Sequence, residues 1–246
     1  MIHTTATINS KAIIGENVNI GAYTIIHENV VIGDNVTIES FCEIGYPTKL
    51  ANGRALIIGE NSLIRSQSIF YEGSTFGAGL VTGHRVTIRE GVTAGLNLQI
   101  GTLCDFQGDC IIGDYVRTHS NVHIGKHSKV GNFVWIFPYV VLTNDPHPPS
   151  DTMMGVTIKD YAIVATMSVI LPGITVNEHS LVGACSLVNR DVPVGMVVGG
   201  NPAKVLCEAS AVKLKGQNKS AYPWPTHFRR GYPDSVIEGW KSEFGE

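Results

Sequence analysis

Hydrophobic residues recur at every sixth position along most of the chain. The pattern runs through positions 8–44, resumes in a shifted frame at 58–142, and returns at 158–194 before it fades at Gly200. Most of these key positions hold Ile, Val or Leu. A period of six fits neither an α-helix, at about 3.6 residues per turn, nor a lone amphipathic strand, at about two. The pattern therefore predicts short strands joined by corners, with three such units closing one triangular coil.

The positions between the key residues agree with a narrow interior. The fourth residue after each key position is small or apolar, and Cys42, Cys104 and Cys110 are among the residues that occupy these inward positions. We interpret these cysteines as core residues. The number of hexads predicts about ten coils. Because neighbouring parallel strands lie ~4.8 Å apart, residues eighteen positions apart in an uninterrupted frame should stack directly.

Two stretches break the period and predict external loops. Residues 45–56 are polar and rich in turn formers, and residues 144–156 contain three prolines that oppose regular strand pairing. Long loops that interrupt a regular scaffold often carry function, although a tolerated insertion remains the alternative.

The chain changes character near residue 205. We divide it into a β-solenoid over residues 1–205 and a short helical or irregular C-terminal cap or tail over residues 206–246. Within the tail, residues 208–215 favour a short helix, and a terminal helix is expected to begin near Asp234 or Ser235, either of which can cap it. The aromatic and proline-rich stretch between them, residues 222–230, is expected to cover the end of the coil.

Composition narrows the classes of partner. A net charge of −3 and a pI near 6.3 give no basic surface for nucleic acid or for a membrane, so neither partner is expected. The first residues show no leader pattern, and we expect a soluble, cytoplasmic protein. Five cysteines without paired ligand spacing indicate neither a disulfide framework nor a zinc knuckle, and no metal is expected.

The eighteen-residue register also places candidate catalytic residues together. Asp105 and His123 should lie side by side on neighbouring outward-facing strands, next to Thr87 and Val141. A carboxylate that accepts a hydrogen bond from one imidazole nitrogen fixes the tautomer and makes the other nitrogen a better base. This pair can remove the proton of an attacking amine or hydroxyl during acyl transfer. An exposed cross-strand pair without function is the alternative.

Other polar residues are secondary candidates. The loop contributes Asn144, Asp145 and His147 as possible catalytic residues. On preceding coils, the cationic residues His84, Arg85 and Arg89 are candidates for holding the phosphates of a substrate.

Near the end of the solenoid the chain resembles the coenzyme A-binding coils of the hexapeptide-repeat acyltransferases. The resemblance spans residues 8–205. It rests on the period, on the stretches VATMSV at 164–169 and VGACSLV at 182–188, and on the closing motif GNPAK at 200–204. It implies an all-β, left-handed parallel β-helix, a homotrimer with sites between subunits, and an acetyl-CoA or short acyl-CoA donor. The matching positions then imply cofactor contacts from a set of six residues: Ala165, Thr166, Gly183, Ala184, Pro202 and Lys204.

Within that superfamily the chain looks most like N-acyltransferases of nucleotide-linked 3-amino-3,6-dideoxyhexoses. The stretches GHRVTIRE at 83–90, VRTHSNVHIG at 116–125 and LTND at 142–145 carry this likeness, which implies a nucleotide-linked amino sugar as substrate and a role in surface-glycan biosynthesis. The loop around His147 is similar to the Thr-x-x-His-Pro motif of hexapeptide O-acetyltransferases but is one residue longer. Cys185, in place of the usual Gly, and the aromatic tail depart from the pattern.

Three other functions stay open. A hexapeptide O-acetyltransferase would share the fold and coenzyme A but depend strictly on a base. A zinc enzyme of the γ-class carbonic anhydrase type needs three converging imidazoles, which His84, His119 and His123 approach only loosely. A non-catalytic scaffold would bind no acyl-CoA. Because no activated Ser or Cys is evident beside a base, we expect direct transfer in a ternary complex.

Overall fold

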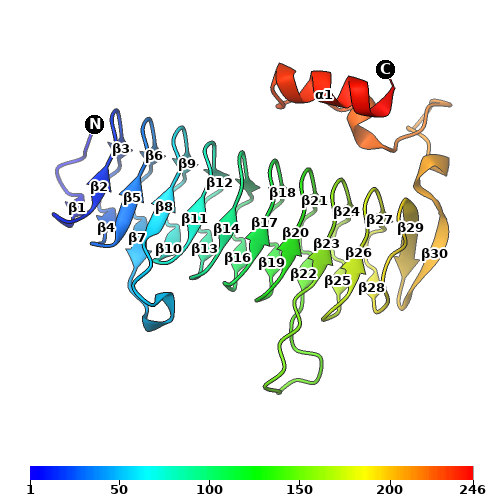
Figure 1. The fold of residues 1–246 in the computed structure, drawn as a ribbon, viewed down its shortest axis with the longest axis horizontal. Coiled ribbons are helices and arrows are strands. Elements are labelled where there is room, and N and C mark those ends of the chain that lie inside the picture. Colours follow the sequence, from blue (N-terminus) through cyan, green and yellow to red (C-terminus); the bar gives the residue numbers. More distant parts are fainter. Residues whose placement is uncertain (246) are drawn as a thin grey trace.

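Three parallel sheets wrap around one narrow interior to form a left-handed parallel β-helix (Figure 1). The computed structural model describes residues 1–245. Sheet I consists of β1 (Thr7–Ile8), β4 (Ile25–Ile26), β7 (Glu43–Tyr46), β10 (Ile69–Tyr71), β13 (Thr87–Ile88), β16 (Asp105–Phe106), β19 (His123–Ile124), β22 (Val141–Leu142), β25 (Val169–Ile170) and β28 (Leu187–Val188). Sheet II consists of β2 (Ile13–Ile14), β5 (Val30–Ile32), β8 (Leu56–Ile58), β11 (Thr75–Phe76), β14 (Thr93–Ala94), β17 (Ile111–Ile112), β20 (Lys129–Val130), β23 (Thr157–Ile158) and β26 (Thr175–Val176).

Sheet III consists of β3 (Asn19–Ile20), β6 (Thr37–Ile38), β9 (Leu63–Ile64), β12 (Val81–Thr82), β15 (Gln99–Ile100), β18 (Arg117–Thr118), β21 (Trp135–Ile136), β24 (Ile163–Val164), β27 (Leu181–Val182), β29 (Met196–Gly200) and β30 (Ala203–Glu208). The chain passes from sheet I to II to III and back to I, so we name the edges the I–II, II–III and III–I corners. Every pairing between named strands is parallel except the closing hairpin of β29 and β30. The expected fold class is therefore confirmed.

The key hydrophobic positions form the core. From Ile20 to Val188 the apolar side chains at these positions are almost completely buried, and Phe70, Phe76 and Phe106 are the largest of the fully buried ones. Ile8 and Ile14 in the first coil are only partly buried, and Val194, where the period ends, is 60% exposed. Each fully buried side chain contributes roughly 1.5–3 kcal/mol through burial. Cys42, Cys104 and Cys110 lie in this core as predicted, and burial raises the pKa of the Cys42 and Cys110 thiols to about 11.

Two external loops leave the solenoid at the I–II corner, as predicted (Figure 1). The first, between β7 and β8, contains a short 3₁₀ helix at Lys49–Ala51. The second connects β22 to β23. Both loops therefore emerge beside the outer face of sheet I.

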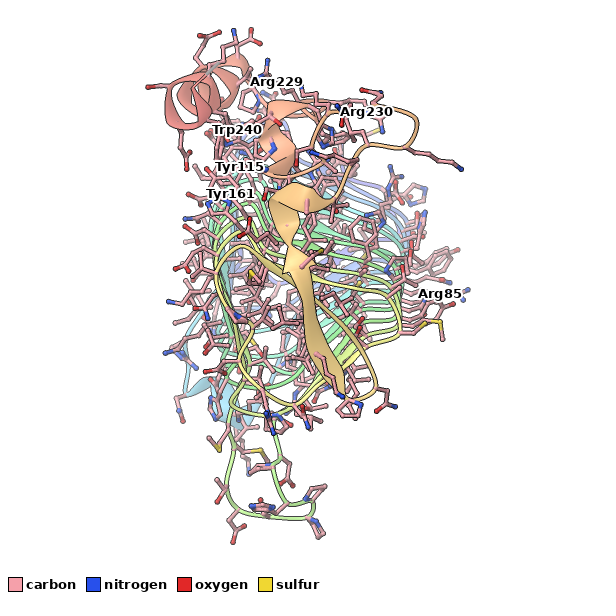
Figure 2. The ribbon with its side chains drawn as sticks, turned by 90° about the vertical axis from the view of Figure 1, so that its right-hand side faces the viewer. Arg85, Tyr115, Tyr161, Arg229, Arg230 and Trp240 are labelled. Atoms are coloured by element: carbon pink, nitrogen blue, oxygen red, sulfur yellow. The ribbon has the colours of Figure 1, made fainter. Side chains whose placement is uncertain are left out.

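The C-terminal tail folds back along the side of the solenoid and does not cover its end (Figure 1). Its helix α1 (Asp234–Phe244) and the 3₁₀ helix Trp224–Thr226 pack over the II–III corner. The reason is an aromatic ladder at that corner, in which Tyr115, Phe133 and Tyr161 stack with ring centroids 5.1–5.2 Å apart. Figure 2 shows Tyr115 and Tyr161 at this corner, near Trp240 of α1. The expectation that the aromatic stretch covers the coil end is corrected accordingly.

Two local expectations for the tail are also corrected. Residues 208–215 do not form an α-helix: β30 extends to Glu208, and only a 3₁₀ turn at Ala209–Ala211 follows. β30 crosses residue 205, at which we divide the chain, because its pairing with β29 continues as far as Glu208. The terminal helix has Pro233 as its N-cap without a side-chain cap bond, so neither Asp234 nor Ser235 caps it. No helix within residues 1–245 is long and apolar enough to cross a bilayer.

Candidate active site

Asp105 and His123 face outward from neighbouring strands of sheet I. The register pairs Asp105 on β16 with His123 on β19, and it pairs Thr87 with Asp105 and Val141 with His123 on either side. His123 Nδ1 lies 3.0 Å from an oxygen of the Asp105 carboxylate. When Nδ1–H donates this bond, Nε2 is left as the hydrogen-bond acceptor. Both side chains are more than a third exposed, so a substrate can reach them.

The surroundings of Asp105 keep its carboxyl group ionised. Burial opposes this by favouring the neutral form, but hydrogen bonds from His123 and Gln107, together with the positive charge of Arg89, lower its pKa below the ordinary value. Gln107 Nε2 donates to Asp105 Oδ2 over 2.6 Å. Gln107 was not predicted from the sequence, although it follows Asp105 by two residues and so lies on the same face of the sheet.

Arg89 lies next to this pair at the I–II corner and is held by a buried carboxylate. Its guanidinium donates to Glu90 Oε1 over 3.2 Å and lies 5.8 Å from the centre of the Tyr71 ring. The Glu90 side chain is only 2% exposed, and within residues 1–245 neither Glu90 Oε2 nor Arg89 Nε has a hydrogen-bond partner. A cation thus borders the candidate site. The burial of Glu90 could not be predicted from the sequence, because a glutamate at a corner normally faces water.

His84 and Arg85 are separated from Arg89 by the length of β13. Both are exposed at the III–I corner, where the strand begins, whereas Arg89 follows its end (Figure 2 shows Arg85). His84 Nδ1 lies 2.8 Å from Ser66 Oγ and 3.8 Å from Glu39 Oε2. Because one nitrogen makes both contacts, Glu39 cannot orient the opposite nitrogen as the acid does in a Ser-His-acid triad.

Asp145 organises the second loop. Its carboxylate accepts bonds from the His147 and Ser150 backbone N–H groups at 3.0 Å and from Ser150 Oγ at 2.6 Å. The Ser150 hydroxyl is the main cause of a lowered Asp145 pKa. His147 is exposed, and Asn144 uses its carbonyl oxygen to accept from Met154 N over 2.8 Å. The structure gives Asp145 a local role in shaping the loop, and it brings none of these side chains into hydrogen-bond contact with His123 among the described residues.

The expected cofactor residues fall in two adjoining places. Ala165 and Gly183 occupy consecutive coils at the III–I corner, with Thr166 and Ala184 next to them. Pro202 and Lys204 line a cavity of about 340 Å³ at the end of the solenoid, together with Arg190. The two places are linked because Gly200 N donates to Ser186 Oγ over 3.2 Å.

The three histidines considered as zinc ligands have separate surroundings within one protomer. His84 contacts Ser66, His119 stacks on Phe137 and His123 contacts Asp105. Among residues 1–245, no three His, Cys, Asp or Glu side chains are grouped as metal ligands would be.

Comparison with known proteins agrees with this architecture. A family described as bacterial transferase hexapeptide (six repeats) matches residues 2–46. An acyl-[acyl-carrier-protein]--UDP-N-acetylglucosamine O-acyltransferase of Campylobacter concisus is 30% identical, over 83% of this chain and 72% of that protein. A 2,3,4,5-tetrahydropyridine-2,6-dicarboxylate N-acetyltransferase of Staphylococcus aureus is 34% identical, over 39% of this chain and 34% of that protein.

The solved structure of an Arabidopsis UDP-N-acetylglucosamine acyltransferase has the same fold. It superposes with a TM-score of 0.72, at 17% identity, over 98% of this chain and 90% of that one. The periodic core, the parallel register and the extended likeness in sequence all agree: the chain belongs to the hexapeptide-repeat acyltransferases and is an acyltransferase.

Proposed function

We propose that this protein transfers a short acyl group from acyl-CoA to the amino group of a nucleotide-linked 3-amino-3,6-dideoxyhexose. The single observation that carries the proposal is the 3.0 Å contact between His123 Nδ1 and Asp105 on an open face of sheet I. Support comes from three stretches of sequence. GHRVTIRE contains Arg89, VRTHSNVHIG contains His123, and LTND forms the start of the second loop.

In the proposed reaction the sugar amine attacks the thioester carbonyl carbon. A C–N bond forms, the C–S bond breaks, and coenzyme A leaves as the thiolate. His123 Nε2 takes the proton lost by the amine, and Asp105 stabilises the resulting imidazolium. The proton then passes to the thiolate or to water. The strand register of sheet I holds His123 and Asp105 in the positions that these roles require.

The surroundings of the core cysteines and of Ser66 support direct transfer in a ternary complex. The three core cysteines are buried, and the pKa of each of their thiols is raised, chiefly by burial. The Ser66 hydroxyl is beside His84, but that histidine has no acid on its other nitrogen among the described residues. An acylated protein detected by intact mass after incubation with acyl-CoA alone would contradict direct transfer.

The family likeness supports a proposal for the assembly and for the acyl donor. We propose a homotrimer, with the acyl-CoA held by the small residues of the III–I corner, Ala165 and Gly183, and with Lys204 close to its phosphates. Small side chains there leave the backbone accessible to pantetheine, and Lys204 is exposed beside the 340 Å³ cavity. Arg89 is proposed to hold a phosphate of the sugar nucleotide, because arginine forms strong charge-assisted bonds with phosphate oxygens.

A second candidate is O-acyl transfer to a UDP-linked sugar from an acyl-carrier protein. The Campylobacter concisus relative is named for that donor and acceptor. The Asp105–His123 pair favours it as well, because a hydroxyl group is a poor nucleophile without a base.

The test crosses donors with acceptors. Purified protein is mixed with acetyl-CoA or with an acyl-acyl-carrier protein, and with nucleotide-linked sugars that carry either a 3-amino group or only hydroxyl groups. Thiol release and product mass are followed together. Acylation of a 3-amino sugar from acetyl-CoA is the expected result. Acylation only of a hydroxyl acceptor, or only from the carrier protein, would replace the proposal with the second candidate, and no acceptance of acyl-CoA or carrier would contradict both.

A further inference from the structure

A cavity lies on another face of the protein from the Asp105–His123 pair. It measures about 680 Å³, within the range of ligand pockets. Its floor is the outer face of sheet III, around β15, β18 and β21, and its wall is the C-terminal tail, which contributes Tyr222, Trp224, Phe228 and Arg230. We call it the sheet III groove. In Figure 2 the labelled Arg230 lies in the tail, across the molecule from the second loop.

The floor of the groove contains a ring ladder that stops abruptly. The His119 and Phe137 rings stack with centroids 4.7 Å apart and planes within 16°. The strand register places Gly101 and then Gly83 at the next two positions of the same column. All four residues line the groove. The His119 ring therefore stacks on Phe137 on one side, and on the other side the next two positions of this column, Gly101 and Gly83, carry no side chain that could stack on it.

The imidazole has the properties of a stacking partner. Burial, and then the positive charge of Arg117, lower the pKa of His119, which favours the neutral form of the ring. A neutral flat ring stacks well on a nucleobase, and every base presents such a face. Trp135 on β21, two residues before Phe137, adds a second ring whose centroid lies 5.9 Å from that of His119.

The rim of the groove favours an anion. Arg117 and Arg230 both line it, and none of its lining residues, all within the described part of the chain, is Asp or Glu. Arg117 is fixed between the rings of Trp135 and Tyr232, at 4.8 and 4.4 Å, and donates to Gly231 O over 3.1 Å. Arg230 is held only loosely, 5.8 Å from the Phe228 ring.

We propose that the sheet III groove binds a nucleoside phosphate, with the base stacked on His119 above Gly101 and the phosphates near Arg230. The same chemistry is present in the pyrimidine nucleotide of a sugar nucleotide and in the adenosine end of coenzyme A, so the groove would be a nucleotide site additional to the phosphate contacts proposed for Arg89 and Lys204. The proposal concerns binding on sheet III and does not rest on the proposed N-acyl transfer. Its test requires no turnover.

The intrinsic fluorescence of the protein gives a direct readout. All three tryptophans of the chain belong to this region: Trp135 and Trp224 line the groove, and Trp240 packs 5.2 Å from Trp224. The protein is titrated with dTDP, UDP, ADP and coenzyme A, and with inorganic diphosphate, thymidine and a long-chain fatty acid for comparison. Saturable quenching by dTDP or UDP alone would identify the sugar-nucleotide source, and quenching by ADP and coenzyme A would identify the adenosine source. Either result supports the proposal.

Matched variants locate the binding. His119→Val should weaken nucleotide binding about 5-fold or more, because stacking on an aromatic ring is lost, whereas His119→Phe should retain it. Arg230→Ala should weaken the binding of dTDP more than that of thymidine. Lys129 is an exposed cation on sheet II, and Lys129→Ala should change the affinity for neither dTDP nor thymidine. No saturable response to any nucleotide, equal affinity of His119→Val and wild type, or a response to the fatty acid alone would overturn the proposal.

Discussion

The two candidate sites are built in different ways. On sheet I, Asp105 and His123 come from adjacent coils, eighteen residues apart, and the strand register alone brings them together. On sheet III, the groove needs partners far apart in sequence, as in the bond from Arg117 to Gly231, 114 residues away. The six-residue repeat of a solenoid can therefore position polar residues on its own, whereas an enclosed apolar cavity requires a segment that lies outside the repeat, such as the C-terminal tail.

The aromatic corner residues show the same contrast. Tyr23 and Phe41 stack at 5.3 Å on the III–I corner and remain 57–60% exposed. Tyr115, Phe133 and Tyr161 stack equally well on the II–III corner, but the tail covers them. A stacked aromatic ladder therefore does not create a cavity by itself. The sheet III groove forms because the C-terminal tail docks on the ladder of the II–III corner.

The largest expected effect is on docking of the tail. Trp240 is 2% exposed and contacts Phe133 and Tyr232, with centroids 5.2 and 4.6 Å apart. Trp240→Ala should destabilise the docked tail by about 3–5 kcal/mol, because a large buried ring is lost. Hydrogen exchange should accelerate in residues 222–244 and stay slow in the coils. Phe41→Ala, which removes an exposed ring, is the control, and equal acceleration throughout the coils would show that solenoid and tail unfold as one unit.

A somewhat smaller effect is expected from Asp105→Asn. The amide can donate to His123 Nδ1 and so select the tautomer in which Nε2 carries the hydrogen and no longer accepts a proton. The turnover number kcat should fall about 10²-fold, which corresponds to about 2.7 kcal/mol. Asp109→Asn, which alters a carboxylate paired with Lys126 at 3.0 Å, serves as the matched control. If both variants lose activity equally, the special role of Asp105 is wrong.

Glu90→Ala should have a smaller effect, which is a decrease in the free energy of unfolding. It removes the buried partner of Arg89 and leaves a guanidinium N–H group unsatisfied, at a cost of about 1–3 kcal/mol. Chemical denaturation measures the change in the free energy of unfolding. Glu28→Ala, which removes an exposed partner of Lys11, should leave that free energy unchanged within error. Similar losses in the two variants would contradict the structural importance of the buried carboxylate.

The smallest expected effect is the pH dependence contributed by Asp105. Because its pKa is lowered in the folded state, its contribution to stability is complete above the unfolded-state value of about 3.9 and is lost as the pH falls through the folded value. The difference in unfolding free energy between wild type and Asp105→Asn should therefore shrink as the pH falls below about 4. A difference that grows in acid would contradict the inferred direction of the pKa shift.

The sequence predicted whatever the six-residue period controls. The three-sheet solenoid, the core cysteines, both loops and the contact of Asp105 with His123 all follow from counting positions. Gln107 could have been found by the same count, since it shares a face with Asp105. The likeness to hexapeptide acyltransferases also predicted the family correctly.

What the period does not control could not be predicted. The position of the tail depends on the match between Trp224, Trp240 and the II–III ladder, which is a tertiary contact without local signal. The interpretation of residues 208–215 as a helix was wrong because the hairpin of β29 and β30 satisfies the backbone of that segment up to Glu208. The roles of His147, Arg85 and the cofactor residues stay predictions.

The most direct test of the account is the single-turnover rate of acyl transfer by His123→Ala. The protein is kept in excess over a limiting amount of acyl donor, at concentrations high enough to bind all of it, and the amino-sugar acceptor is saturating. The chemical step is then observed without product release, and His147→Ala is measured alongside. The account predicts that His123→Ala slows this step about 10²-fold or more while His147→Ala remains close to wild type. Equal rates for His123→Ala and wild type would contradict the assignment of His123 as the base.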